Sequence, residues 1–161
     1  MDFSGYMRIE GENQGAIEGS SLRRGRRGLV NIHGFKHGVN QFSQSRNNLN
    51  NGPVVHQPVA ISKEVDKSTP HLYQALVTKE NLTIDLEWFR FDTRGEEQLY
   101  YKIHVVGAYI TQLEQWMPEV KSVEVEHQRL METVSIFYDE ISWHWGPDGD
   151  TAFTTTWRGE A

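Results

Sequence analysis

Alternating apolar and polar residues recur along most of this chain, which is the pattern of β-strands with one buried face. The clearest run spans residues 82–88, where Leu, Ile, Leu and Trp alternate with Thr, Asp and Glu. The alternation shifts at Phe89 and Phe91, which predicts a β-bulge at that point. Further strands are predicted at residues 6–10, 29–42, 54–62, 99–113, 134–138, 141–145 and 151–157.

One segment has a helical pattern instead. Either Ser68 or Thr69 can cap a helix, and Pro70 suits the first helical position. Leu72, Ala75 and Leu76 would then share one face, and the helix is expected to end near residues 79–81. We expect its apolar face to pack against the sheet.

The strands are expected to fold into a small β-barrel of two packed antiparallel sheets with one short α-helix, a mainly β fold. Residues 146–149 read Gly-Pro-Asp-Gly and predict a hairpin turn before the last strand. The parity of burial switches near residues 139–140, as in folds where one strand serves two sheets. The length of 161 residues fits a single domain, residues 1–161.

Two segments lack a strand pattern. Residues 11–28 are rich in Gly, Ser and Arg and are expected to form a loop. Residues 41–53 are almost wholly polar, and a loop of that length inside a compact domain is either disordered or functional. We expect this second segment to project from the domain.

Charge and composition exclude several classes of function. The net charge of −6 disfavours general nucleic-acid binding, which needs a basic surface. The basic run at residues 23–27 is interpreted as a solvated loop or as a contact for an acidic partner surface. The chain has no cysteine, so it forms no disulfide and no thiolate metal site. Neither a classical signal peptide nor a membrane span is expected, so no stable membrane insertion is predicted.

Several histidines, tryptophans and carboxylates could form a chemical site or could serve only a structural role. His33 and His37 are four residues apart, but on a strand that spacing covers roughly 13 Å, too far for one metal ion. Trp143 and Trp145 could form a sugar-stacking platform. They fall on the same strand face as Ile141, however, and are interpreted as core. The carboxylates at residues 96–97 are expected to be solvated. The sequence contains none of the common catalytic motifs, so we expect no enzyme activity, no metal and no cofactor.

Two long motifs carry a family resemblance. Residues 63–76 read Lys-Glu-Val-Asp-Lys-Ser-Thr-Pro-His-Leu-Tyr-Gln-Ala-Leu, and residues 132–143 read Glu-Thr-Val-Ser-Ile-Phe-Tyr-Asp-Glu-Ile-Ser-Trp. Together with shorter matches at residues 99–103 and 108–111, they resemble the haemolysin-coregulated protein family over nearly the whole chain. His37 is a departure, because many members carry tryptophan there.

The resemblance implies a tube protein of a type VI secretion system. Members form rings of six subunits that stack into the inner tube, carry small effector proteins in the lumen, and meet sheath, baseplate and spike proteins. Assembly in the bacterial cytoplasm, followed by secretion without a classical signal peptide, is implied. The alternative class is a non-catalytic ligand-binding module, such as a carbohydrate-binding β-sandwich.

The resemblance further implies that the polar loop at about residues 41–53 reaches from one ring towards the next. Charge makes the arginine run a second candidate for this contact. The candidate ring-stacking residues are Gln44, Ser45, Arg46, Asn47, Asn48, Leu49, Asn50, Asn51, Arg23, Arg24, Arg26 and Arg27.

Overall fold

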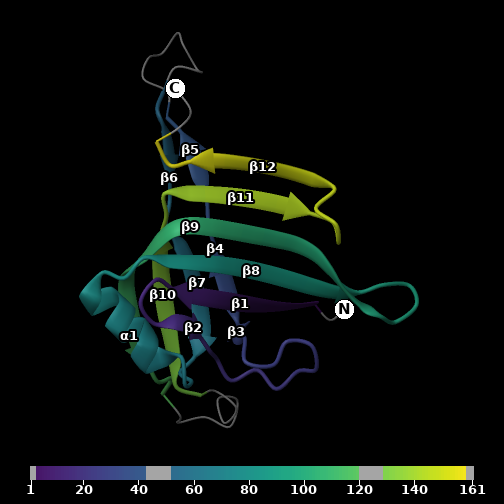
Figure 1. The fold of residues 1–161 in the computed structure, drawn as a ribbon, viewed down its shortest axis with the longest axis horizontal. Helices are drawn as coiled ribbons and strands as arrows, with labels where there is room; N and C mark the ends of the chain where they lie inside the picture. Colours follow the sequence, from purple (N-terminus) through teal and green to yellow (C-terminus); the bar gives the residue numbers. More distant parts are fainter. Residues whose placement is uncertain (1–2, 43–51, 120–128, 159–161) are drawn as a thin grey trace.

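The computed structural model describes residues 3–42, 52–119 and 129–158 (Figure 1). Two antiparallel sheets share one long strand, β9 (Glu97–Trp116). The first sheet also contains β1 (Phe3–Gly11), β2 (Gly15–Ile17), β3 (Val30–Ile32), β8 (Leu82–Phe91), β11 (Glu140–Trp145) and β12 (Thr151–Thr156). The second sheet adds β10 (Met131–Phe137), β7 (Val59–Glu64) and β4 (Gly34–Lys36). A mainly β fold of two antiparallel sheets with one short helix is therefore confirmed.

Strand β9 passes from one sheet to the other near its middle. Its first half pairs with β8 and β11, and residues from Tyr109 to Trp116 pair with β10. Gly107 lies at the crossing with a φ of 60°, a left-handed conformation that favours glycine. The side chain of Asp139 packs so closely that a Cβ on Gly107 would lie 2.9 Å from the Asp139 Cβ. The sequence placed this switch near residues 139–140, but there the chain leaves β10 for β11, and the strand that serves both sheets is β9.

The core lies between the sheets and follows the predicted alternation. Leu82, Ile84 and Leu86 of β8 are fully or almost fully buried, and the register of β8 against β9 shifts between Trp88 and Phe89. The predicted bulge is therefore confirmed. Residues of the second sheet that meet this face include Ile61, Val134 and Ile136.

Helix α1 (Thr69–Thr78) covers one end of the core with Leu72 and Ala75. Ser68 occupies the N-cap position, as one of the two predicted options, but its side chain makes no capping bond. Its hydroxyl instead donates to Asp66 Oδ1 at 2.5 Å, and the Asp66 amide donates to Thr69 Oγ1 at 3.1 Å. Within the described ranges, no helix is long and apolar enough to cross a membrane.

Three sequence predictions about strands were wrong in detail. Residues 29–42 form three short strands, β3, β4 and β5 (Val39–Gln41), because each pairs with a different strand. Residues 54–62 divide into β6 (Val54–His56) and β7 at Pro58, which has no amide hydrogen to donate to a ladder. The predicted loop at residues 11–28 contains β2, which pairs with the end of β1.

Candidate assembly surfaces

The arginine cluster consists of Arg23, Arg24, Arg26 and Arg27 in the basic run at residues 23–27. Two of these four arginines make contacts within their own chain. The guanidinium groups of Arg23 and Arg26 reach Glu97 Oε2 at 2.9 and 3.2 Å. Arg26 also stacks over Phe89, with its guanidinium carbon 3.6 Å from the ring centroid. A cation held against an aromatic face and paired with a carboxylate is stabilised by both contacts. These two arginines therefore fix the loop between β2 and β3 to the first sheet.

The carboxylate of Glu97 is not solvated, so the sequence prediction for it was wrong. Its side chain is only 12% exposed, and Glu97 Oε1 accepts a hydrogen bond from the Ser4 hydroxyl at 3.1 Å. The arginine loop folds back over it from more than 70 residues away, a contact that local sequence does not reveal. Arg24 and Arg27 are exposed, and neither makes an ion pair with any residue that the structure describes. Their charges remain available to a partner.

Strands β5 and β6 form a separate hairpin that pairs with neither sheet. Four apolar side chains on or beside it are exposed: Val39, Phe42, Val54 and Val55 are 38%, 52%, 54% and 38% accessible. An isolated two-stranded hairpin is marginally stable in water, so this one is expected to gain stability from a neighbour. Figure 1 shows the hairpin extending past β12 at the top of the view.

The predicted loop at about residues 41–53 begins and ends in this hairpin. Its stacking candidates Gln44, Ser45, Arg46, Asn47, Asn48, Leu49, Asn50 and Asn51 lie outside the described residues. The described flanks are held together, since the Phe42 amide donates to the Pro53 carbonyl at 3.1 Å.

Strand β12 is an open edge of the first sheet. Among the described strands it pairs only with β11, and Phe153 is 62% exposed. Trp145, at the end of β11, is 51% exposed, so the interpretation of Trp145 as core was wrong. It is the last residue of β11, where it pairs with Thr151 at the start of β12. Exposed strand edges with apolar side chains are sites where another chain can pair.

The tryptophans do not form a flat exposed platform. Trp143 packs against the core and stacks on Phe153, with ring centroids 6.2 Å apart and an interplanar angle of 3°. One of its faces is therefore covered by a neighbouring ring. This arrangement favours a structural interpretation of Trp143.

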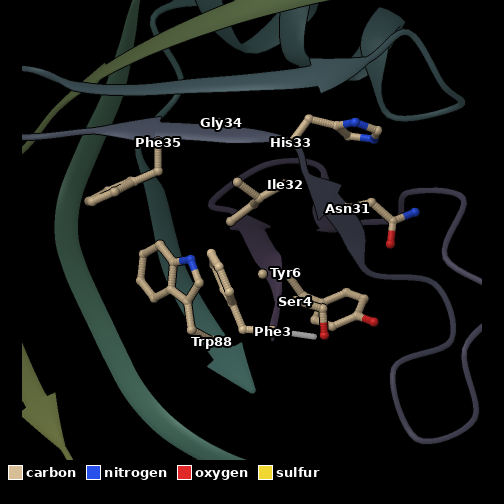
Figure 2. A pocket seen from close by; sticks show the side chains of 10 residues that line it. Phe3, Ser4, Tyr6, Asn31, Ile32, His33, Gly34, Phe35 and Trp88 are labelled. Atoms are coloured by element: carbon tan, nitrogen blue, oxygen red, sulfur yellow. The ribbon is translucent and has the colours of Figure 1, made fainter. Parts of the chain in front are cut away.

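A cavity of about 430 Å³ opens where the chain leaves β3 for β4 and so passes from one sheet to the other. Figure 2 shows the rings of Phe3, Phe35 and Trp88 gathered at one end, with His33 directed away from them. Phe35 meets Trp88 edge to face at a centroid distance of 4.8 Å. The Ser4 hydroxyl in the lining is bound to Glu97 rather than to a histidine, so no serine–histidine pair forms here.

The two candidate histidines have separate partners. His33 lies 3.6 Å from Glu64, and no cluster of three or more metal-ligating side chains occurs in the part of the chain that is described. His37 contacts Tyr138, 101 residues away, and Tyr138 also contacts His56. The sequence analysis did not predict this contact. The only local feature that pointed to it was the histidine at position 37, where many family members carry tryptophan.

Comparisons with known proteins agree with this geometry. Residues 6–145 match the family model described as type VI secretion system effector, Hcp. The chain is 29% identical to the "Major exported protein" of Pseudomonas aeruginosa, covering 95% of this chain and 94% of that protein.

Solved structures give the same result. A crystal structure of an Hcp protein matches with a TM-score of 0.90 and 26% identity, over 99% of this chain and 100% of the other. The secreted protein Hcp3 from Pseudomonas aeruginosa matches with a TM-score of 0.79 and 26% identity, over 98% and 100%. The chain therefore belongs to the Hcp family, the secreted tube proteins of type VI secretion systems.

Proposed function

We propose that this chain is a non-catalytic tube subunit that assembles into rings of six and that these rings stack into a secreted tube. Membership of the Hcp family supports this role. The observation that carries it is the pair of uncovered apolar edges, the β5–β6 hairpin and strand β12. A head-to-tail contact that joins different edges of identical subunits closes into a ring or continues as a filament.

The rest of the proposal follows from the same family. The chain would act as one tube-protein domain, assemble in the bacterial cytoplasm, and carry small effector proteins through the lumen. Sheath, baseplate and spike proteins would be its partners. Contacts between rings would use the loop at about residues 41–53 together with Arg24 and Arg27. Arg23 and Arg26 are less suited to this contact, because both are already paired with Glu97.

Ring formation can be tested through the exposed edge of β12. We expect gel filtration with light scattering to give a mass near six subunits at micromolar concentration. Phe153→Glu places a charge on the exposed apolar edge and is expected to give monomers.

Val77→Glu is the control, because Val77 on helix α1 is also apolar and is 77% exposed but belongs to neither edge. This variant is expected to keep the wild-type mass. A wild-type protein that remains monomeric, or equal disruption by both variants, would contradict the proposal.

A further inference from the structure

Three side chains join the β5–β6 hairpin to the body of the protein. The Tyr138 hydroxyl lies 3.0 Å from His37 Nε2 and 2.5 Å from His56 Nδ1. His37 comes just before β5, and His56 is the last residue of β6. The two histidines therefore lie where the hairpin joins the rest of the chain. Tyr138 follows β10 and is fully buried. We call these three residues the His–Tyr–His clamp.

The two hydrogen bonds of the clamp depend on which ring nitrogens of the histidines carry a hydrogen. A hydroxyl carries one hydrogen, so Tyr138 donates to one imidazole nitrogen and accepts a hydrogen bond from the other. Both bonds form when both imidazoles are neutral and their tautomers are complementary. A proton added to the accepting nitrogen places an N–H against the O–H. The hydroxyl hydrogen must then turn away from that nitrogen, and Phe137, which stacks on the Tyr138 ring, offers no acceptor.

The surroundings also disfavour charge on either imidazole. Burial lowers the pKa of His37 and that of His56, and the neighbouring His56 lowers the pKa of His37 further. A backbone hydrogen bond with Gln57 acts in the opposite direction on the pKa of His37. The charged residues next in the chain, Lys36 and Asp139, are exposed, and no carboxylate faces the two histidines among the described contacts.

We propose that the His–Tyr–His clamp is an acid-sensitive latch whose protonation frees the β5–β6 hairpin from the body and weakens the contacts that the hairpin makes with a second copy of the chain. The contact with a second copy rests on the proposed function, whereas the latch itself rests only on the geometry of the single chain. The neutral, latched form is fully favoured above the ordinary histidine pKa of 6.5 and loses its advantage as the pH falls below that value.

The test is hydrogen exchange of the hairpin amides at about pH 7.5 and about pH 5, the range in which histidine changes charge. The matched variant carries His37→Gln with His56→Asn, because glutamine places a polar atom near Nε2 and asparagine near Nδ1, and neither titrates. At the acidic pH, we expect exchange in the wild-type hairpin to be several-fold faster than in this variant. At the higher pH, the two should exchange alike. Comparison at equal pH removes the intrinsic effect of pH on exchange.

Two further variants complete the experiment. His144→Gln removes a histidine elsewhere on the first sheet and should keep the acid response. Tyr138→Phe removes the hydroxyl that both histidines contact and should loosen the hairpin at both pH values. Equal hairpin exchange in wild type and the Gln/Asn variant at the acidic pH would overturn the latch.

Light scattering of the same samples separates the latch from the proposed function. We expect the wild-type assembly to dissociate on acidification and the Gln/Asn variant to remain assembled. If the hairpin loosens in acid while the protein is monomeric at both pH values, the latch stands and the proposed ring is wrong. If rings form and stay assembled at the acidic pH although the hairpin loosens, the hairpin does not make the contact between copies.

Discussion

A buried ion pair is the most consequential contact at the scale of single residues. Lys63 on β7 and Glu132 on β10 face each other across the strands, and both side chains are fully buried. The Lys63 ammonium also donates to Asp66 Oδ1 at 3.1 Å, and the Thr69 hydroxyl donates to Glu132 Oε1 at 2.8 Å. The network therefore joins two strands to the start of helix α1.

Removing one partner of this pair leaves a charge buried without compensation. Lys63→Met is expected to lower the free energy of unfolding by about 3–5 kcal/mol. A double variant with Glu132→Leu should recover much of that loss, because it removes both of the fully buried charges. Urea denaturation measures both effects.

Lys67→Met is the matched control. Its ion pair with Glu18, at 3.5 Å, joins side chains that are 58% and 66% exposed, and loss of such a pair costs less than about 1 kcal/mol. An equal loss of stability in the two single variants would contradict this account of the network.

At the scale of elements, the end of helix α1 adopts a conformation that its residue does not favour. Lys79 has a φ of 54° and a ψ of 43°, and it is the only non-glycine residue with positive φ in the described ranges. This turn directs Glu80 towards the start of the chain, where Glu80 Oε2 accepts the amides of Asn13 and Gln14 at 3.3 and 3.0 Å. The helix end thus holds the turn between β1 and β2.

Glycine at this position relieves the backbone strain. We expect Lys79→Gly to raise the free energy of unfolding by up to about 1 kcal/mol, the relief being partly offset by the greater freedom of glycine in the unfolded chain. Thermal unfolding should show a higher Tm. Lys67→Gly, at an exposed site without positive φ, should give no increase, and an equal gain at both positions would contradict the explanation.

At the scale of the whole molecule, charge opposes the proposed stacking of rings. Six copies of a chain with net charge −6 carry about −36, and two such rings repel each other at close approach. Arg24 and Arg27 are the members of the arginine cluster left without an internal partner among the described residues, so they can offset this repulsion locally. Each exposed pair contributes only about 0–1 kcal/mol, but the contact would repeat around the ring.

Salt and substitution together test this contribution. We expect Arg24→Ser with Arg27→Ser to leave rings intact and to reduce their stacking at low salt, as seen by electron microscopy. Salt near 1 M, where the Debye length is about 3 Å, should dissolve wild-type stacks.

Lys67→Ser with Lys79→Ser removes the same charge elsewhere and should stack like wild type. Stacking promoted by salt would show that net repulsion dominates. Stacking that ignores both salt and the arginine substitutions would show that apolar or backbone contacts hold the rings.

Local patterns were enough to predict most of the elements. The alternation at residues 82–88, the bulge that follows it, the helix after Pro70 and the turn at residues 146–149 depend on residues close together in sequence. Side-chain periodicity and turn chemistry act over a few residues, so they can be read directly from the chain. The two family motifs could also be recognised from the sequence. The sequence did not show what their polar residues contact.

Tertiary structure alone decided which distant residues meet. The two motifs come together at the Lys63–Glu132 pair, Arg26 reaches Glu97 across 71 residues, and His37 finds Tyr138 across 101. It also divided residues 29–42 among three partners and left the hairpin and β12 uncovered. These outcomes depend on which strands pair and in what order they lie in the sheets. Such contacts are set by the packing of the whole chain, because no local pattern specifies which of several compatible strands will lie alongside.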